Sequence, residues 1–200
     1  YGEQPQDLER LAEDYAGAPD PLNPLNAYGV AKRTAELLCA IFTRDYRLDC
    51  ITARGFAFVG PYLPLDGNFA VGNFILDALE GRPIRIEGDG SPVRSYLYGE
   101  DLAIWLWFLL LVGKKGESYN VGSDQGLSIL DLAREVSAAA PEPVVIEGPM
   151  VQKSGAGRNR YLPDIEKAGA LGVDVWTPLD EALKKTFQWH ISQRNWPTDR

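Results

Sequence analysis

The clearest hydrophobic pattern in this chain lies in residues 26–46, where apolar side chains recur every three or four positions. That spacing places them along one face of a helix, and Asn26 stands where an N-cap is expected. The segment 50–58 that follows is rich in β-branched and aromatic residues and ends at Gly60–Pro61. This composition predicts a buried strand after the helix.

Residues beyond Gly60 predict further helices and strands in alternation. A Gly-Asp-Gly turn at 88–90 is expected to join two short strands within 82–98, and Asp101 is expected to cap a helix over 102–112. The alternation predicts an α/β fold. The remaining predicted helices cover 73–81, 128–140 (with Ser128 and Asp131 arranged like a capping box), 164–171 and 178–192, and the remaining strands cover 117–123 and 143–148.

Composition narrows the class of protein. The 200 residues carry a net charge of −8, which argues against a nucleic-acid or anionic membrane partner, because both need clustered lysine and arginine. We expect no signal peptide, and the most apolar run, 102–112, is too short to cross a bilayer. Cys39 and Cys50 lack metal-ligand spacing and fit buried thiols in a reducing compartment, and His190 is the single histidine. We therefore expect a cytoplasmic protein without a metal site.

Tyr28 and Lys32 form the most suggestive polar pair in the chain. On a helix, residues four apart lie on one face and are close enough to interact. A lysine ammonium stabilises a nearby phenolate, so such a pair can exchange protons near neutral pH, and the spare ammonium donors can bind ligand hydroxyls. Spacing alone favours an ordinary solvated surface pair, so the context has to decide.

Several motifs supply that context, in a fixed order along the chain. Together they resemble the extended short-chain dehydrogenase/reductases, the nucleotide-sugar epimerase/dehydratase family, over essentially the whole chain. The resemblance implies hydride transfer between a sugar carbinol and NAD or NADP, with NAD favoured, and a nucleotide-diphosphate sugar as substrate. The motifs are PLNAYGVAKRTAE (24–36), ARGFAFVGP (53–61), GDGSPVRSYLYGEDLA (88–103), SYNVGS (118–123) and LPDIEKAGALGVDVWTPLDEALKKTFQW (162–189).

The same resemblance implies roles for four residues around the cofactor. Tyr28 is the implied catalytic acid/base. Lys32 would tune this phenol and hydrogen-bond the nicotinamide ribose. Phe56 and the backbone from Arg54 to Ala57 would flank the nicotinamide.

Substrate contacts are implied for a further group of polar residues. Arg94 matches the arginine that grips the nucleotide diphosphate, a task that suits a planar, bidentate guanidinium. Without the motif, Arg94 would be read as an exposed hairpin charge. Arg158 and Arg160 fall where another phosphate-facing arginine occurs, and Arg160 is the one predicted. Asn68 and Asn73 fall where amides of a substrate loop occur.

Three departures from the family pattern matter. Ala57 stands in place of the usual asparagine, which puts one substrate hydrogen bond in question, and Gly99 replaces a common valine. The third is that no GxxGxxG phosphate-binding turn is found. The stretch SGAGRNR (154–160) resembles one only superficially, because no strand leads into it and no apolar helix follows.

The resemblance also divides the chain. Residues 1–60 correspond to the remaining part of a Rossmann-type, doubly wound NAD(P)-binding domain with the active-site helix. Residues 61–200 correspond mainly to the smaller C-terminal α/β substrate-binding domain, with possible return segments to the first part. We expect a C-terminal portion that lacks the glycine-rich half, binds NAD(P) poorly and is inactive alone. The resemblance also implies a homodimer.

Two other functions stay open at this point. The first is a non-catalytic module of the same fold that binds a sugar nucleotide; a glycine-rich turn and a serine or threonine upstream of Tyr1 would instead favour the enzyme. The second is a glycosidase that uses two carboxylates, although a turn and a helix cap give such residues ordinary structural roles. Its candidates are Glu87, Asp89, Glu100 and Asp101. Within the family, epimerase, dehydratase and reductase activities are equally open.

Overall fold

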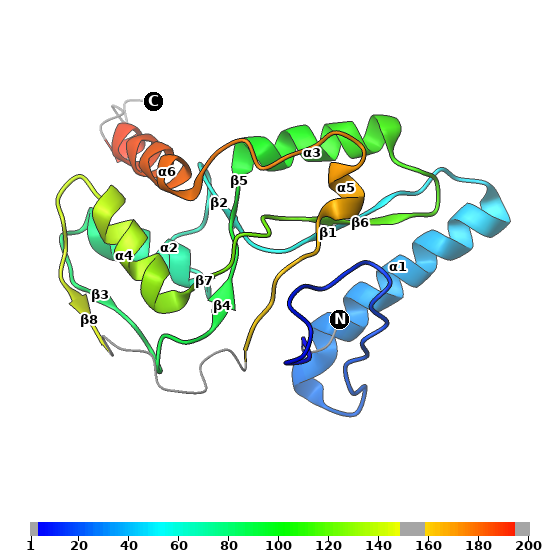
Figure 1. Ribbon diagram of the computed structural model, residues 1–200, viewed down its shortest axis with the longest axis horizontal. Coiled ribbons are helices and arrows are strands. Elements are labelled where there is room, and N and C mark those ends of the chain that lie inside the picture. The colour runs from blue at the N-terminus through cyan, green and yellow to red at the C-terminus, as the bar shows by residue number, and fades with distance from the viewer. Residues whose placement is uncertain (1–3, 149–158, 195–200) are drawn as a thin grey trace, which may run out of the picture.

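The computed structural model describes residues 4–148 and 159–194. Figure 1 shows short strands and longer helices in alternation, as the α/β prediction requires. In chain order the elements are η1 (Pro24–Asn26), α1 (Ala27–Tyr46), β1 (Thr52–Gly55), β2 (Phe58–Val59), α2 (Ala70–Leu79), β3 (Ile84–Arg85), β4 (Val93–Arg94), β5 (Leu97–Tyr98), α3 (Gly99–Val112), β6 (Ser118–Val121), β7 (Leu127–Ser128), α4 (Ile129–Ala139), β8 (Ile146–Glu147), α5 (Glu166–Gly169) and α6 (Leu179–Arg194).

Three of the four strand pairs in the described part of the chain are parallel. β1 pairs with β6, β2 with β5 and β3 with β8 in parallel, whereas β4 and β7 are antiparallel. A parallel pair needs a long crossover, and the chain between β1 and β6 supplies one that contains α2 and α3. The α/β prediction is therefore confirmed.

Two predictions about strands are wrong. The strand expected over 50–58 is interrupted at Phe56–Ala57, so that β1 and β2 join different partners. The hairpin expected around 88–90 does not form. Gly88 and Gly90 do adopt positive φ values of 74° and 68°, but the strands on either side pair with β8 and β7 rather than with each other. The turn is local, whereas its strands are held by distant segments.

The helix ends follow local chemistry in most places. Arg47, with φ of 56°, ends α1 in the left-handed conformation. Ser128 caps α4 as predicted, because its Oγ accepts the Asp131 N–H at 3.0 Å. The cap predicted at Asp101 is wrong: α3 begins at Gly99, and the buried Asp101 carboxylate accepts the N–H and the hydroxyl of Thr177, each at 2.9 Å.

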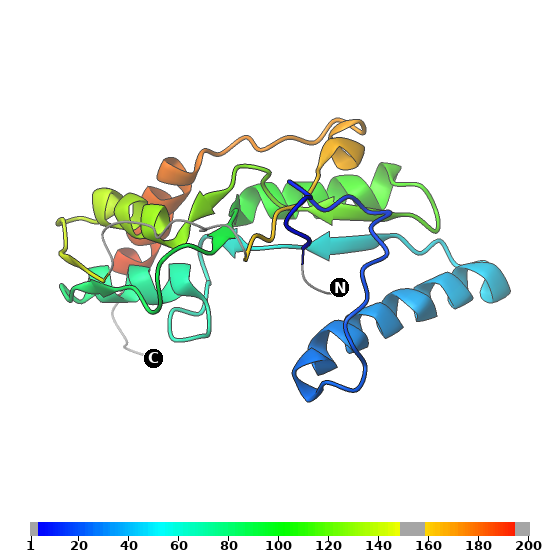
Figure 2. The ribbon, with the colours of Figure 1, turned by 60° about the horizontal axis from the view of Figure 1, so that its bottom comes forward.

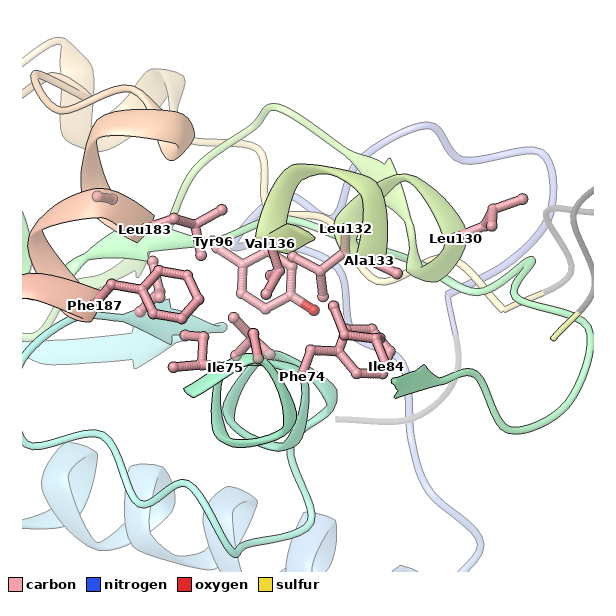
Figure 3. Packing of buried hydrophobic residues seen from close by; sticks show 14 of the residues in the cluster. Phe74, Ile75, Ile84, Tyr96, Leu130, Leu132, Ala133, Val136, Leu183 and Phe187 are labelled. Atoms are coloured by element: carbon pink, nitrogen blue, oxygen red, sulfur yellow. The ribbon is translucent and has the colours of Figure 1, made fainter. Parts of the chain in front are cut away.

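The main hydrophobic core lies between α2, α4 and α6 (Figure 3). Phe74 and Ile75 of α2 point toward Leu132 and Val136 of α4, and Phe187 of α6 closes the cluster. A second cluster joins α3 to β5, β6 and the segment around α5 through Leu97, Trp105, Leu109, Tyr119, Val121, Ala168 and Val173. β6 pairs with β1, so residues from the second part of the chain lie directly against the first part. The boundary at residue 60 stays a prediction.

Helix α1 is held differently from the other long helices. All 20 of its residues are described and none is fully buried. It lies on one side of the β1–β6 pair, and α3 lies on the other (Figure 2).

Cys39 and Cys50 are free and only half-buried, so the prediction of buried thiols is wrong. Within the described ranges, no helix is both long and apolar enough to span a bilayer.

Phe187→Ala tests the main core. The side chain is 2% exposed, and its removal leaves a cavity between α6 and α2. We expect the free energy of unfolding to fall by about 3–5 kcal/mol in urea titrations. The exposed neighbour Gln188→Ala is the control, and the packing described here is wrong if the two variants have equal midpoints.

Candidate active site

Tyr28 and Lys32 lie together at the start of α1. The Lys32 Nζ is 5.4 Å from the centroid of the Tyr28 ring, over its face. The phenol is 76% exposed, so both groups are open to a ligand. The spacing of one helical turn thus gives the juxtaposition that the sequence predicts.

Arg54 ties β1 to α1 and to the loop before it. Its Nε and Nη2 donate to the two carboxylate oxygens of Glu36 on α1, both at 2.8 Å, and its Nη1 donates to the carbonyl of Glu13 at 2.8 Å. The two charged side chains are only 17% and 19% exposed, so water screens the pair less than a surface pair. The side chain of Arg54 therefore positions α1, while its backbone forms part of β1.

Asn120 fixes the same loop to β6, and sequence reasoning missed it. Its backbone N–H donates to Glu13 Oε1 at 2.7 Å, and its side-chain amide donates to the carbonyls of Leu11 and Asp164 at 2.8 and 3.0 Å. The available signal was a polar residue between apolar neighbours inside the predicted strand 117–123, because an amide that becomes buried needs partners. Asn120 thus joins three distant segments at one point.

Phe56 and Tyr161 form an aromatic pair at the carboxyl end of β1. Their ring centroids are 4.8 Å apart with 29° between the planes. Burial raises the pKa of Tyr161; the nearby Tyr28 raises it further, and Arg54 and Arg94 lower it. One phenol is therefore within electrostatic reach of residues from α1, β1 and β4. Tyr161 was missed in the sequence, although it directly follows the predicted Arg160.

Arg94 lies beside this pair on β4, and the hairpin reading of it is wrong. Nη1 donates to the carbonyls of Val93 and Asn159, and Nη2 donates to Asn159 Oδ1, all at 2.8 Å. Burial lowers its pKa, although the phenols of Tyr96 and Tyr161 raise it. Of the five N–H donors of a guanidinium, its bonds to described residues use three, and the other two can bind a ligand.

The other predicted substrate residues are more scattered. Arg160 is next to this group, since its backbone bridges Val93, whereas Arg158 lies outside the described residues. Asn68 is exposed in the loop before α2. The Asn73 amide, oriented to satisfy its neighbours, donates to the carbonyls of Leu65 and Gly67 and so holds that loop. No contact in the described part joins either asparagine to Arg94.

Two hollows lie near these residues. A cleft of about 20 Å³ at the carboxyl ends of β1 and β6 is lined by Tyr15, Arg54, Phe56, Asn120 and Tyr161 among others. Ligands of doubly wound sheets bind at such strand ends. A larger cavity of about 340 Å³ separates α1 from β1 and is lined by residues such as Cys39 and Thr52, but not by Tyr28, Lys32 or Arg94. Those three residues do not line the smaller cleft either; we take it as the candidate site because Phe56 and Tyr161 meet there.

Two of the four carboxylates considered for a glycosidase have structural partners. Asp89 accepts the N–H and the hydroxyl of Ser91, and Asp101 is bound by Thr177. These contacts favour turn and helix-packing roles over a pair of catalytic carboxylates. Across residues 4–148 and 159–194, no group of three or more His, Cys, Asp or Glu side chains is placed to hold a metal ion.

Comparison with known proteins identifies the family. Residues 1–122 match the model of the NAD dependent epimerase/dehydratase family, and the chain belongs to this family. It is 35% identical over 176 residues, 88% of its length, to a trifunctional UDP-glucose 4,6-dehydratase/UDP-4-keto-6-deoxy-D-glucose 3,5-epimerase/UDP-4-keto-L-rhamnose-reductase of Arabidopsis thaliana. The resemblance inferred from the motifs is confirmed.

Two further relatives show how much of the fold is shared. The chain is 31% identical to dTDP-glucose 4,6-dehydratase 1 of Escherichia coli, over 86% of the chain. It superposes on UDP-glucose 4-epimerase of Thermotoga maritima with a TM-score of 0.79 and 26% identity, over 96% of this chain and 60% of that one. The chain spans 26% of the Arabidopsis protein and 49% of the E. coli protein. The Rossmann-like α/β fold is thereby confirmed.

Glu36→Gln tests whether the ion pair holds α1. Loss of the carboxylate leaves the half-buried Arg54 charge poorly paired, which costs about 1–3 kcal/mol. We expect amide hydrogens of α1 to exchange about tenfold faster or more, while those of β6 keep their rates. Asp45→Asn breaks the exposed Arg44–Asp45 pair on the same helix and should leave exchange unchanged. Equal effects of the two variants would contradict this role.

Proposed function

We propose that this chain supplies the catalytic helix and the substrate-binding part of an NAD-dependent nucleotide-sugar epimerase or dehydratase. The observation that carries the proposal is that Tyr28 and Lys32 lie together on one exposed face of α1. Tyr161 is within electrostatic reach of both Tyr28, which raises its pKa, and Arg94, which lowers it. An acid/base group and a guanidinium suited to phosphate thus lie on either side of Tyr161.

The residues present fit the nicotinamide end of the proposed cofactor. An exposed phenol and an ammonium that can donate to ribose hydroxyls stand side by side on α1, and the Phe56 backbone lies at the carboxyl end of a parallel strand. NAD, when bound, supplies the acceptor for the hydride of the sugar carbinol. Its pyrophosphate needs a glycine-rich turn, which the sequence motifs of this chain do not provide.

Tyr28 then has one chemical task. It accepts the proton of the sugar hydroxyl as the carbinol carbon is oxidised, and it returns a proton when the carbon is reduced. The phenolate form of Tyr28 has to be present before it accepts this proton, and the Lys32 ammonium, close to the ring face, is the charge that would stabilise it. The reaction needs the sugar oxygen at hydrogen-bond distance from Tyr28, and positioning the diphosphate through Arg94 provides that alignment.

A nucleotide-diphosphate sugar is the proposed substrate. The two unused N–H donors of Arg94 can pair with one phosphate group in a bidentate manner. Partial burial strengthens such a pair by excluding water. NAD rather than NADP, a homodimer and a cytoplasmic location are parts of the same proposal that stay predictions.

The role of Arg94 can be tested by calorimetric titration of the chain with UDP-glucose. Arg94→Gln removes the charge that pairs with phosphate, and we expect affinity to fall about 10- to 100-fold. Arg85→Gln, which removes an exposed arginine of β3 that pairs with Glu147 of β8, is the matched control. Equal binding by the two variants would contradict the proposed substrate site.

Tyr28→Phe tests the acid/base assignment. In an NAD-binding polypeptide that contains these residues, loss of the hydroxyl should lower kcat about 10²- to 10⁴-fold, with KM for the nucleotide sugar nearly constant. The readout is NADH absorbance in single-turnover assays. Tyr46→Phe changes another exposed tyrosine of the same helix and should retain full activity. Retention of activity by Tyr28→Phe would overturn the assignment.

A further inference from the structure

The two cysteines of the chain face one cavity. The hollow of about 340 Å³ between α1 and β1 is lined by Cys39 of α1 and by Cys50, which precedes β1. Both thiols are free and half-buried, and neither lines the smaller cleft proposed as the active site. Two thiols that share a hollow can be joined by oxidation, which gives this pair a chemistry that a single cysteine lacks.

The backbone pairing of β1 with β6 extends outward to Cys50. The Cys50 carbonyl accepts the N–H of Gly116 at 2.8 Å. Successive residues of an extended segment point to opposite faces, so Cys50, Thr52 and Arg54 share one face. From that face Arg54 reaches Glu36 of α1. The Cys50 side chain therefore points toward α1, as the lining of the cavity also requires.

Helix α1 passes close to this segment at Thr43. A β-carbon added at Gly116, which is bonded to Cys50, would lie 3.6 Å from the methyl carbon of Thr43. Cys39 is four residues before Thr43, so it lies on the same face of the helix and roughly 6 Å along the axis. Cys39 is thus about one helical turn from the place where α1 meets the segment that carries Cys50.

The cavity gives α1 room to approach the strand. A disulfide needs α-carbons roughly 4.4–6.8 Å apart, so the hollow between the two thiols has to close as the bond forms. None of the residues of α1 is fully buried, so this movement does not break a hydrophobic core. We propose that Cys39 and Cys50 form a redox-sensitive dithiol site. It reacts with a small disulfide such as oxidised glutathione and becomes a disulfide that holds α1 against β1.

The reaction is two successive thiol–disulfide exchanges. One cysteine, as its thiolate, attacks a sulfur of oxidised glutathione, forms a mixed disulfide and releases one glutathione. The thiolate of the other cysteine then attacks the protein sulfur of that mixed disulfide and releases the second glutathione. Two protein thiols are oxidised to one disulfide, and the small disulfide is reduced to two thiols.

The disulfide would act on the helix that the Arg54–Glu36 pair already positions. In the reduced chain this hold is ionic, with both side chains partly exposed. Oxidation would add a covalent link about one turn further along the same face of α1. The proposal does not depend on the roles proposed for Tyr28 and Arg94, and its tests use neither activity nor UDP-glucose.

The first experiment equilibrates the chain with mixtures of reduced and oxidised glutathione, stops the exchange with acid and determines masses by mass spectrometry. We expect a monomer that has lost two hydrogens; because the chain contains two cysteines, that product identifies the bond. The equilibrium constant should be about tenfold or more larger in native buffer than in concentrated urea. The fold already places the two segments side by side, whereas the unfolded chain loses entropy when the loop closes.

A matched control moves one thiol by a single residue. Leu38→Cys combined with Cys39→Ser places it at an exposed position of α1 that does not line the cavity. In this variant the constant in native buffer should not exceed that in urea. Equal constants for the control and the unchanged chain in native buffer would show that the cavity does not select the pair.

Hydrogen exchange measures the effect on α1. Oxidation should slow the amides of α1 about tenfold, while those of α4, packed in the main core, keep their rates. In Glu36→Gln, oxidation should bring the α1 rates back toward those of the unchanged chain. In Cys39→Ser, the oxidant should change none of these rates. If oxidation leaves α1 unaffected, the disulfide does not hold the helix.

Three further outcomes would overturn the proposal. The first is a reaction that stops at the mixed disulfide with glutathione, and the second is a disulfide-linked dimer in place of the oxidised monomer. The third is an equilibrium constant in native buffer that is no larger than in urea. Each would show that the fold does not bring Cys39 and Cys50 together.

Discussion

The bidentate ion pair between Arg54 and Glu36 is the constraint on which the site depends. Helix α1 carries the acid/base pair, yet none of its residues is fully buried, so hydrophobic packing cannot fix its position. Arg54 holds it to β1, and Arg33 adds bonds to the carbonyls of Ala16 and Gly17. Charged, half-buried contacts of this kind have strict geometry, which suits a helix that has to present two side chains at one cleft.

Local chemistry explains which parts of the fold were predictable. The positions of the α1 ends and the cap at Ser128 depend on neighbouring residues, so the sequence predicts them well, although Asn26 precedes α1 without making a side-chain cap bond. Strand pairing depends on distant segments, and there the predictions failed. The glycines at 88 and 90 make the expected turn, but β3 and β4 leave it toward β8 and β7. Nothing local distinguishes that outcome from a hairpin.

The same division holds for the site. Tyr28 and Lys32 are one helical turn apart, so their proximity follows from the sequence alone, and the family motifs pointed to Phe56 and Arg94. Tyr161 and Asn120 were missed because their roles arise from contacts between segments far apart in the chain. Asp101 was assigned to a helix cap because its true partner, Thr177, is 76 positions away. Long-range polar contacts leave little trace in a single sequence.

The most direct test of this account is an NMR chemical-shift map of the isotopically labelled chain during addition of UDP-glucose. The account predicts that the largest shifts fall on Arg94, Tyr161 and Phe56 and extend to the Tyr28 ring. That pattern would place the ligand at the carboxyl ends of β1 and β6. Shifts centred instead on Cys39, Thr43 and Thr52, in the larger cavity behind α1, would contradict the central claim.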